Sequence, residues 1–118
     1  MDLKTLEGNA SACRMCELHR GRMKSVFARG PEKAPIFICG MCPGPEENIQ
    51  GAPFVGTAGK ILDTILDEVG CEAYITNLVK CFVQPGNPLE ERWMITCLPY
   101  LVLQIENEAY FRRNRVEY

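Results

Sequence analysis

The chain has 118 residues, of which 47% are hydrophobic and 24% are charged, and its formal net charge at pH 7 is −2. These values exclude a disordered chain, and the near-neutral charge gives no overall basic field for nucleic acid. No apolar run reaches the length of a membrane span, and residues 1–4 lack the apolar stretch of a secretory leader. We therefore expect one small domain in the cytoplasm, without a membrane partner.

The N-terminal part of the chain predicts short helices and then a polar loop. Residues 2–20 place apolar side chains at helical spacing, with Cys13-x-x-Cys16 between or within one or two short helices. Residues 20–34 hold five basic side chains and one acidic side chain. We interpret this segment as a solvated loop, and an edge that contacts phosphate is the alternative.

A strand and a glycine-rich loop form the centre of the chain. The apolar run Ile36–Cys39 predicts a buried strand over about residues 35–39, and a loop from Gly40 to Gly56 follows it. A Gly/Pro-rich loop at the carboxyl end of a strand lets the backbone approach a ligand closely. A connecting loop without a ligand is the plainer interpretation.

The second half of the chain predicts a helix, a strand and a further helix. Apolar spacing after Thr57 indicates a helix with one buried face that ends near Gly70. The β-branched run 73–79 predicts a strand, which a crossover of this length would pair in parallel with the first. A helix over about residues 89–108 contains Pro99, so we expect a kink or break there. Two strands leave open sheet edges that a partner could cover.

The seven cysteines indicate metal ligation, because an odd number without a secretory leader argues against a disulfide framework. One possible quartet joins Cys13-x-x-Cys16 with Cys39-x-x-Cys42, close to zinc-ribbon spacing. The other joins Cys13-x-x-Cys16 with Cys81 and Cys97, and four thiolates can hold Zn²⁺ or a [4Fe–4S] cluster. Cys39 ends an apolar strand, where cysteine is usually a buried hydrophobe, so we favour the second quartet.

Five segments, in this order and spacing, resemble the iron–sulfur uracil-DNA glycosylases of family 4. They are Cys13-x-x-Cys16, Gly40-x-x-Pro43-Gly44-x-Glu46-Glu47, Gly51-x-Pro53-Phe54-Val55-Gly56-x-Ala58-Gly59, Tyr74–Cys81 and Cys97-x-Pro99-Tyr100-Leu101-x-x-Gln104-Ile105. The resemblance implies an α/β fold: a truncated three-layer, parallel-sheet uracil-DNA glycosylase-like domain over residues 1–118. It also implies that the four cysteines matching Cys13, Cys16, Cys81 and Cys97 hold a [4Fe–4S] cluster.

The resemblance implies roles for residues around the glycine-rich loop as well. The aromatic side chain matching Phe54 stacks on a uracil flipped out of DNA, and the amide matching Asn77 hydrogen-bonds its Watson–Crick edge. Gly40 and Met41 are expected to line the same pocket. The segment Gly40–Asn48 is expected to carry the group that activates water.

The chain departs from the family pattern at its acidic positions. The family has one acid directly after the first glycine and another that closes the motif, where this chain has Met41 and Asn48. It also has a C-terminal His-Pro-Ser segment, whereas the single histidine here is His19. Neither Met41 nor Asn48 can act as a carboxylate base. We therefore assign no catalytic residue, and Glu46 and Glu47 are the candidates.

Three functions follow, and we favour the first. It is a catalytically silent relative that acts as a binding or assembly subunit. Its expected partners are DNA or a protein such as a polymerase or another nucleic-acid machine, bound through the open sheet edge and Arg112–Arg115. The alternatives are an active uracil-DNA glycosylase that hydrolyses the N-glycosidic bond, and a zinc-ribbon-like binding module that uses Cys39 and Cys42.

Overall fold

Two parallel strands organise the computed structural model of this chain. They are β2 (Ile36–Gly40) and β3 (Ala73–Asn77), and their register pairs Ile36 with Ala73 and Gly40 with Asn77. The structure describes the backbone of residues 2–115 and the side chains of residues 2–108. The parallel pair predicted from the two apolar, β-branched runs is confirmed.

A third strand, β1 (Ala28–Arg29), pairs antiparallel with β3, so the strand order is β1-β3-β2. The prediction of a solvated loop over residues 20–34 is therefore wrong at its centre, and the sheet is mixed rather than purely parallel. Val26 and Phe27 are almost completely buried, and the Val26 amide donates to the Lys80 carbonyl (2.8 Å). Burial of this short apolar run places the segment on the sheet.

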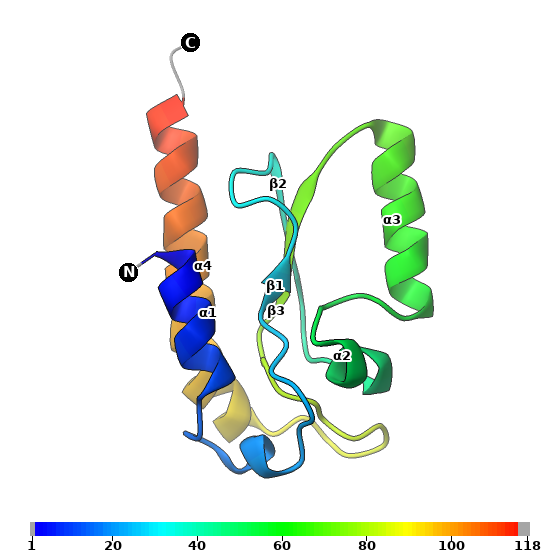
Figure 1. Ribbon diagram of the computed structural model, residues 1–118, viewed down its shortest axis with the longest axis vertical. Coiled ribbons are helices and arrows are strands. Elements are labelled where there is room, and N and C mark those ends of the chain that lie inside the picture. Colours follow the sequence, from blue (N-terminus) through cyan, green and yellow to red (C-terminus); the bar gives the residue numbers. More distant parts are fainter. Residues whose placement is uncertain (1, 116–118) are drawn as a thin grey trace.

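Helices lie on both sides of the sheet. Those described are α1 (Leu3–Ser11), the 3-10 helix η1 (Glu17–Arg20), α2 (Pro45–Gln50), α3 (Thr57–Val69) and α4 (Glu91–Arg115). Figure 1 shows α1 and α4 on one side of the sheet and α3 on the other. The chain therefore has a mixed α/β fold with a small sheet.

Helix α2 interrupts the segment from Gly40 to Gly56, which the sequence predicts to be one continuous loop. Pro45 lies in the first turn of α2, where its missing amide hydrogen costs no helical hydrogen bond. Gly51 ends the helix with a positive φ of 79°. The proline and glycine in this stretch are therefore helix start and stop signals, and the loop prediction is wrong there.

The main apolar core lies between the sheet and the helices α1 and α4. Its buried residues are Leu3, Leu6, Ala10, Phe27, Ala34 and Tyr74. Leu3, Leu6 and Ala10 follow the helical spacing that predicts the N-terminal helix. Full burial of a leucine side chain contributes about 1.5–3 kcal/mol, so this face holds α1 on the domain.

A buried polar cluster connects α4 to β3. The Lys80 ammonium group donates to Thr76 Oγ1 (2.7 Å), to Gln104 Oε1 (2.6 Å) and to the Asn77 carbonyl. Gln104 Nε2 in turn donates to the Tyr74 hydroxyl (3.0 Å). Burial lowers the pKa of Lys80 to about 8. Because all three ammonium donors have acceptors, the lysine can nevertheless remain buried.

Two apolar surfaces that the sequence predicts to be buried are exposed. On α3 the side chains of Ile61, Ile65 and Val69 are each more than half exposed, and Cys39 on β2 is exposed as well. β2 lies at one edge of the sheet, and no other strand in the described part of the chain pairs with its outer side. The predicted open edge is confirmed, whereas the predicted burial of Cys39 and of this α3 face is wrong.

Helix α4 continues through Pro99 to Arg115, so a break is absent, and the alternative of a kink at Pro99 stays a prediction. Pro99 is exposed, so water can donate a hydrogen bond to the helix carbonyl that the missing proline amide leaves without a donor. The helical spacing of Trp93, Cys97, Leu101 and Ile105 predicts one buried stripe, but only Trp93 and Cys97 are buried, whereas Leu101 is half-buried and Ile105 is exposed. The backbone of Arg112–Arg115 belongs to α4, but the side chains of this basic stretch lie outside those that the structure describes. No helix in the described residues is long and apolar enough to cross a membrane.

The start of α3 provides a test of the packing. A Cβ atom at Gly59 would lie 1.7 Å from the Phe54 carbonyl oxygen. Because the loop or the helix must then move, we expect Gly59→Ala to lower the free energy of unfolding by about 1–3 kcal/mol. Gly8→Ala in α1 is the matched control, since its Cβ meets nothing within 4 Å. That control should stabilise the protein by about 0.5–1 kcal/mol. Urea unfolding measures both, and equal effects would contradict the close approach.

Candidate functional site: a pocket at the strand ends and a thiol pocket

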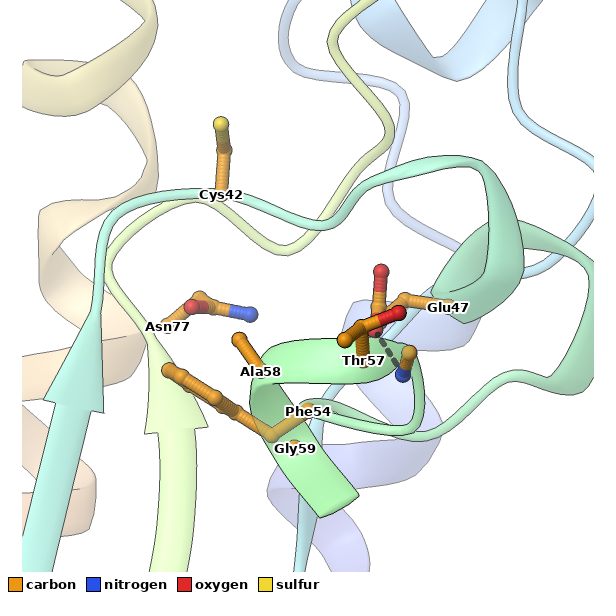
Figure 2. Close-up of a pocket in the computed structure, with 8 residues that line it drawn as sticks. Cys42, Glu47, Phe54, Thr57, Ala58, Gly59 and Asn77 are labelled. Carbon is orange, nitrogen blue, oxygen red and sulfur yellow. Dashed lines mark hydrogen bonds between the residues drawn. The ribbon is translucent and has the colours of Figure 1, made fainter. Parts of the chain in front are cut away.

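A pocket opens beyond the carboxyl ends of β2 and β3, where the sequence predicts the ligand site (Figure 2). Its lining residues are Cys42, Glu47, Phe54, Gly56, Thr57, Ala58, Gly59 and Asn77. The Phe54 ring and the Asn77 side chain lie next to each other beside the strand ends, and Glu47 lies across the pocket. The structure therefore brings together an aromatic face and an amide.

The register of the parallel strands explains why these two side chains meet. Gly40 is the register partner of Asn77. A Cβ atom at Gly40 would lie 2.5 Å from Asn77 Oδ1 and 2.6 Å from the Phe54 ring. Because glycine leaves this space free, the amide and the ring can both occupy it. Asn77 is only 3% exposed, so its side chain enters the pocket from a rigid position.

The backbone of Phe54 has an unusual conformation. Its φ is 56°, the only positive φ of a non-glycine residue in the described chain. This left-handed conformation costs about 1–2 kcal/mol for a residue with a Cβ atom. Arg29 of β1 donates from Nε to the Pro53 carbonyl (2.7 Å) and from Nη2 to the Phe54 carbonyl (3.0 Å). The same Nη2 contacts Asp63 of α3 (2.8 Å), so Arg29 ties this loop to both a strand and a helix.

Glu47 of α2 also binds the backbone of this loop. Its Oε2 atom accepts hydrogen bonds from the amides of Val55 (2.9 Å) and Gly56 (3.0 Å), and Oε1 accepts from Gly44 (3.0 Å). Burial raises the pKa of the Glu47 carboxyl, but these hydrogen bonds outweigh burial, so its pKa lies below the ordinary value. A carboxylate with a lowered pKa and both oxygens bonded to backbone is a weak general base.

The other positions singled out by the sequence lie outside the pocket lining. The Met41 side chain is 54% exposed, and its carbonyl accepts from the Val79 amide (2.9 Å). Glu46 is exposed at the start of α2. Asn48 is buried, and its Oδ1 accepts from the Met23 amide (2.8 Å), which fastens α2 to the segment before β1. The structure therefore does not bring the Met41 or Glu46 side chain into the pocket.

The four cysteines of the favoured quartet meet in a second, smaller pocket. Cys13 and Cys16 follow α1, Cys81 follows β3, Cys97 lies in α4, and all four line this pocket. We call it the thiol pocket. Its formation from three distant parts of the chain supports the grouping that the sequence favours.

Nitrogen donors point at two of the sulfur atoms. Arg22 Nη1 donates to Cys81 Sγ (3.2 Å), and the Lys80 amide donates to Cys97 Sγ (3.4 Å). Burial raises the pKa of Cys97 to about 11. Burial also raises the pKa of Cys81, although Arg22 opposes this shift. Both thiols are therefore protonated at neutral pH, and a metal centre that binds them must displace protons.

Four thiols around one pocket form a donor set that either Zn²⁺ or a [4Fe–4S] cluster can use. Zn²⁺ needs sulfur atoms at about 2.3 Å from one point. Among the residues with described side chains, no group of three or more His, Cys, Asp or Glu is arranged to hold a metal ion. In a [4Fe–4S] cluster each thiolate binds a different iron, which suits thiols around one pocket. The zinc-ribbon quartet is not assembled, since Cys39 is exposed and Cys42 lines the other pocket.

Two residues that hold the pocket in place, Arg29 and Gly59, are not indicated by the sequence patterns. Arg29 lies in the segment interpreted as a loop, and the buried pair Val26–Phe27 before it is the signal for a strand there. Gly59 belongs to a matching segment, but only the structure shows that it packs on the Phe54 carbonyl. Both residues act through contacts that are remote in sequence.

The hydrogen bonds of Glu47 give a prediction with a matched control. We expect Glu47→Gln to lower the free energy of unfolding by about 1–3 kcal/mol, because an amide cannot accept from the same set of backbone donors. Exposed Glu46→Gln should change it by less than about 0.5 kcal/mol. A lowered pKa in the folded state stabilises the protein above the ordinary pKa of 4.5, and this stabilisation is lost as the pH falls through the folded-state value. Urea unfolding measured against pH should therefore show the free energies of unfolding of the parent chain and of Glu47→Gln converging in acid. A difference between them that stays constant with pH would contradict this role.

Comparisons with known proteins identify the family of this chain. The model of the uracil DNA glycosylase superfamily matches residues 27–112. A type-4 uracil-DNA glycosylase of Saccharolobus solfataricus is 38% identical over 110 residues, which cover 90% of this chain and 51% of the relative. The corresponding protein of Archaeoglobus fulgidus is 42% identical over 101 residues, covering 80% of this chain and 49% of the relative. The chain thus spans about half the length of the curated relatives that it matches. It belongs to the uracil-DNA glycosylase superfamily.

Proposed function

We propose that this chain forms a base-recognition unit of the uracil-DNA glycosylase type and binds an extruded uracil without hydrolysing its N-glycosidic bond. The observation that carries the proposal is the pocket in which the Phe54 ring and the Asn77 amide meet over Gly40. Proteins that flip bases read them by stacking and by hydrogen bonds to the Watson–Crick edge. We take uracil as the base because the matched relatives are named uracil-DNA glycosylases.

The carboxylates around the pocket support binding without hydrolysis. Hydrolysis requires a group that activates water and a charge that stabilises the developing cation on the sugar. Three backbone amides bind the Glu47 carboxylate, and Glu46 is exposed outside the pocket lining. Met41 and Asn48 carry no carboxylate. We therefore favour a catalytically silent relative that acts as a binding or assembly subunit.

An active glycosylase is the second candidate. The names of the similar proteins favour it, since each is a type-4 uracil-DNA glycosylase. In that case Glu46 or Glu47 would be the first group to examine as the activator of water. Release of free uracil from DNA separates this candidate from the silent relative.

The expected partners belong to the same proposal. DNA would present the extruded uracil. A protein partner, such as a polymerase or another nucleic-acid machine, would bind at the unpaired edge of β2 and the exposed α3 residues Ile61, Ile65 and Val69. Open strand edges and exposed apolar patches are typical of surfaces that other chains cover.

We also propose that Cys13, Cys16, Cys81 and Cys97 hold a [4Fe–4S] cluster. Their meeting in the thiol pocket supports it, as do the N–H donors aimed at Cys81 and Cys97. When bound, the cluster supplies a covalent link between the N-terminal segment, the end of β3 and α4. Such a link stabilises a domain with so small a core.

The uracil pocket gives the main functional prediction. We expect calorimetric titration with uracil-containing single-stranded DNA to show binding. Phe54→Ala should weaken that binding about tenfold or more, because stacking contributes about 1–3 kcal/mol per base. Asn77→Ala should weaken it similarly by removing the fixed amide. Ile49→Ala, an exposed change on α2, is the control and should bind like the parent chain.

The same samples should release no free uracil from the DNA. Uracil release by the parent chain would contradict the silent relative and favour the active glycosylase. Binding that survives both pocket substitutions unchanged would refute the base-recognition pocket itself.

The thiol pocket gives a separate prediction. Protein purified without oxygen should be brown and contain iron and sulfide in equal amounts. Cys81→Ser should lose most of the iron and unfold at lower denaturant, because one ligand and its hydrogen bond to Arg22 are removed. Cys39→Ser, at the exposed edge of β2, should keep the iron. Colourless protein with zinc, lost on Cys39→Ser, would instead favour the zinc-ribbon module.

A further inference from the structure

The peptide group between Phe54 and Val55 is contacted by opposite charges at its two ends. The Phe54 carbonyl accepts from Arg29 Nη2 (3.0 Å), and the Val55 amide donates to Glu47 Oε2 (2.9 Å). Rotation of this peptide plane would turn the carbonyl towards the carboxylate and the amide towards the guanidinium group. The plane is therefore fixed in one orientation, and with it the direction in which the Phe54 side chain leaves the backbone.

We propose that Arg29 is a positioning residue for base recognition: it fixes the Pro53–Phe54 backbone so that the Phe54 ring lies beside Asn77 in the pocket. The inference rests on the proposed function, because it assigns Arg29 a part in uracil binding. Arg29 does not line the pocket and acts through Phe54.

The geometry of Arg29 suits a positioning role better than the role of an ordinary surface charge. Its planar fork reaches two successive carbonyls, those of Pro53 (2.7 Å) and Phe54 (3.0 Å). Asp63 of α3 contacts the same guanidinium group at 2.8 Å and limits its rotation. The Arg29 side chain is 27% exposed and that of Asp63 49%. Partly exposed ion pairs stabilise a fold little, so loss of Arg29 should affect the loop more than global stability.

The experiment compares Arg29→Ala with Arg92→Ala. Arg92 forms ion pairs with Glu17 and Glu90, whereas Arg29 forms one with Asp63, and Arg92 lies at the start of α4, away from the 53–56 loop. Uracil affinity, hydrogen exchange of the Val55 amide and urea unfolding are measured on each chain. All three are then repeated with methylguanidinium added, which can occupy the space that the shortened side chain leaves. Arg29→Lys, which keeps the charge but not the fork, is measured as well.

We expect Arg29→Ala to weaken uracil binding about tenfold, the factor that corresponds to one charge-assisted hydrogen bond. Exchange of the Val55 amide should accelerate by a similar factor, because the loop opens more often. Methylguanidinium should restore both properties to Arg29→Ala but leave Arg92→Ala unchanged, and Arg29→Lys should lie between. A purely structural role would move only the urea midpoint and would show no rescue.

The proposal is overturned if Arg29→Ala matches Arg92→Ala in uracil affinity and in Val55 exchange. If Arg29→Ala fails to fold, the same comparison is made with Arg29→Lys. If the parent chain binds no uracil, the proposed function fails, and Val55 exchange with its rescue decides the positioning role alone. Unaltered exchange in that case also refutes the inference.

Discussion

The orientation of one peptide group, between Phe54 and Val55, is the constraint on which the candidate site depends. The left-handed backbone of Phe54 costs about 1–2 kcal/mol. Hydrogen bonds to charged groups contribute about 1.5–3 kcal/mol each, and this peptide group makes one with Arg29 and one with Glu47. The bonds therefore exceed the strain, and the conformation persists. Gly59 completes the arrangement, because a side chain there would collide with the Phe54 carbonyl.

The end of β3 joins the two pockets. Asn77 lies in the first pocket and Cys81 in the second, with residues 78–80 between them. Lys80 belongs to this segment and contacts both of its ends: its ammonium group donates to the Asn77 carbonyl, and its amide donates to Cys97 Sγ. A centre bound in the thiol pocket would therefore order the same segment that follows Asn77. In this account, the proposed cluster supports base recognition through the backbone rather than through contact with the base.

Local patterns in the sequence predict the parts of the fold that depend on short segments. They give the parallel pair β2 and β3 and helix α3. They also favour the four cysteines that line the thiol pocket, whose ligation of a cluster stays a prediction, and the resemblance to a known family places Phe54 and Asn77 in one pocket. They do not predict β1 or Arg29, because a two-residue strand has no periodicity and its contacts are remote in sequence. The glycines and prolines around α2 were ambiguous between loop and helix ends. Periodicity also does not predict that the apolar face of α3 is exposed. The spacing of apolar residues shows that a face is apolar, but it does not show what covers that face.

The most direct test of the central claim is to locate uracil on the protein by nuclear magnetic resonance. Isotope-labelled chain would be titrated with uracil, and contacts between the base protons and the protein would be measured. We expect magnetisation transfer between uracil and the Phe54 ring, together with a shift of the Asn77 side-chain amide signals. Thymine carries an added methyl group and serves as the comparison ligand. Uracil contacts confined to other parts of the chain, or signals of Phe54 and Asn77 that do not change at saturation, would contradict the account.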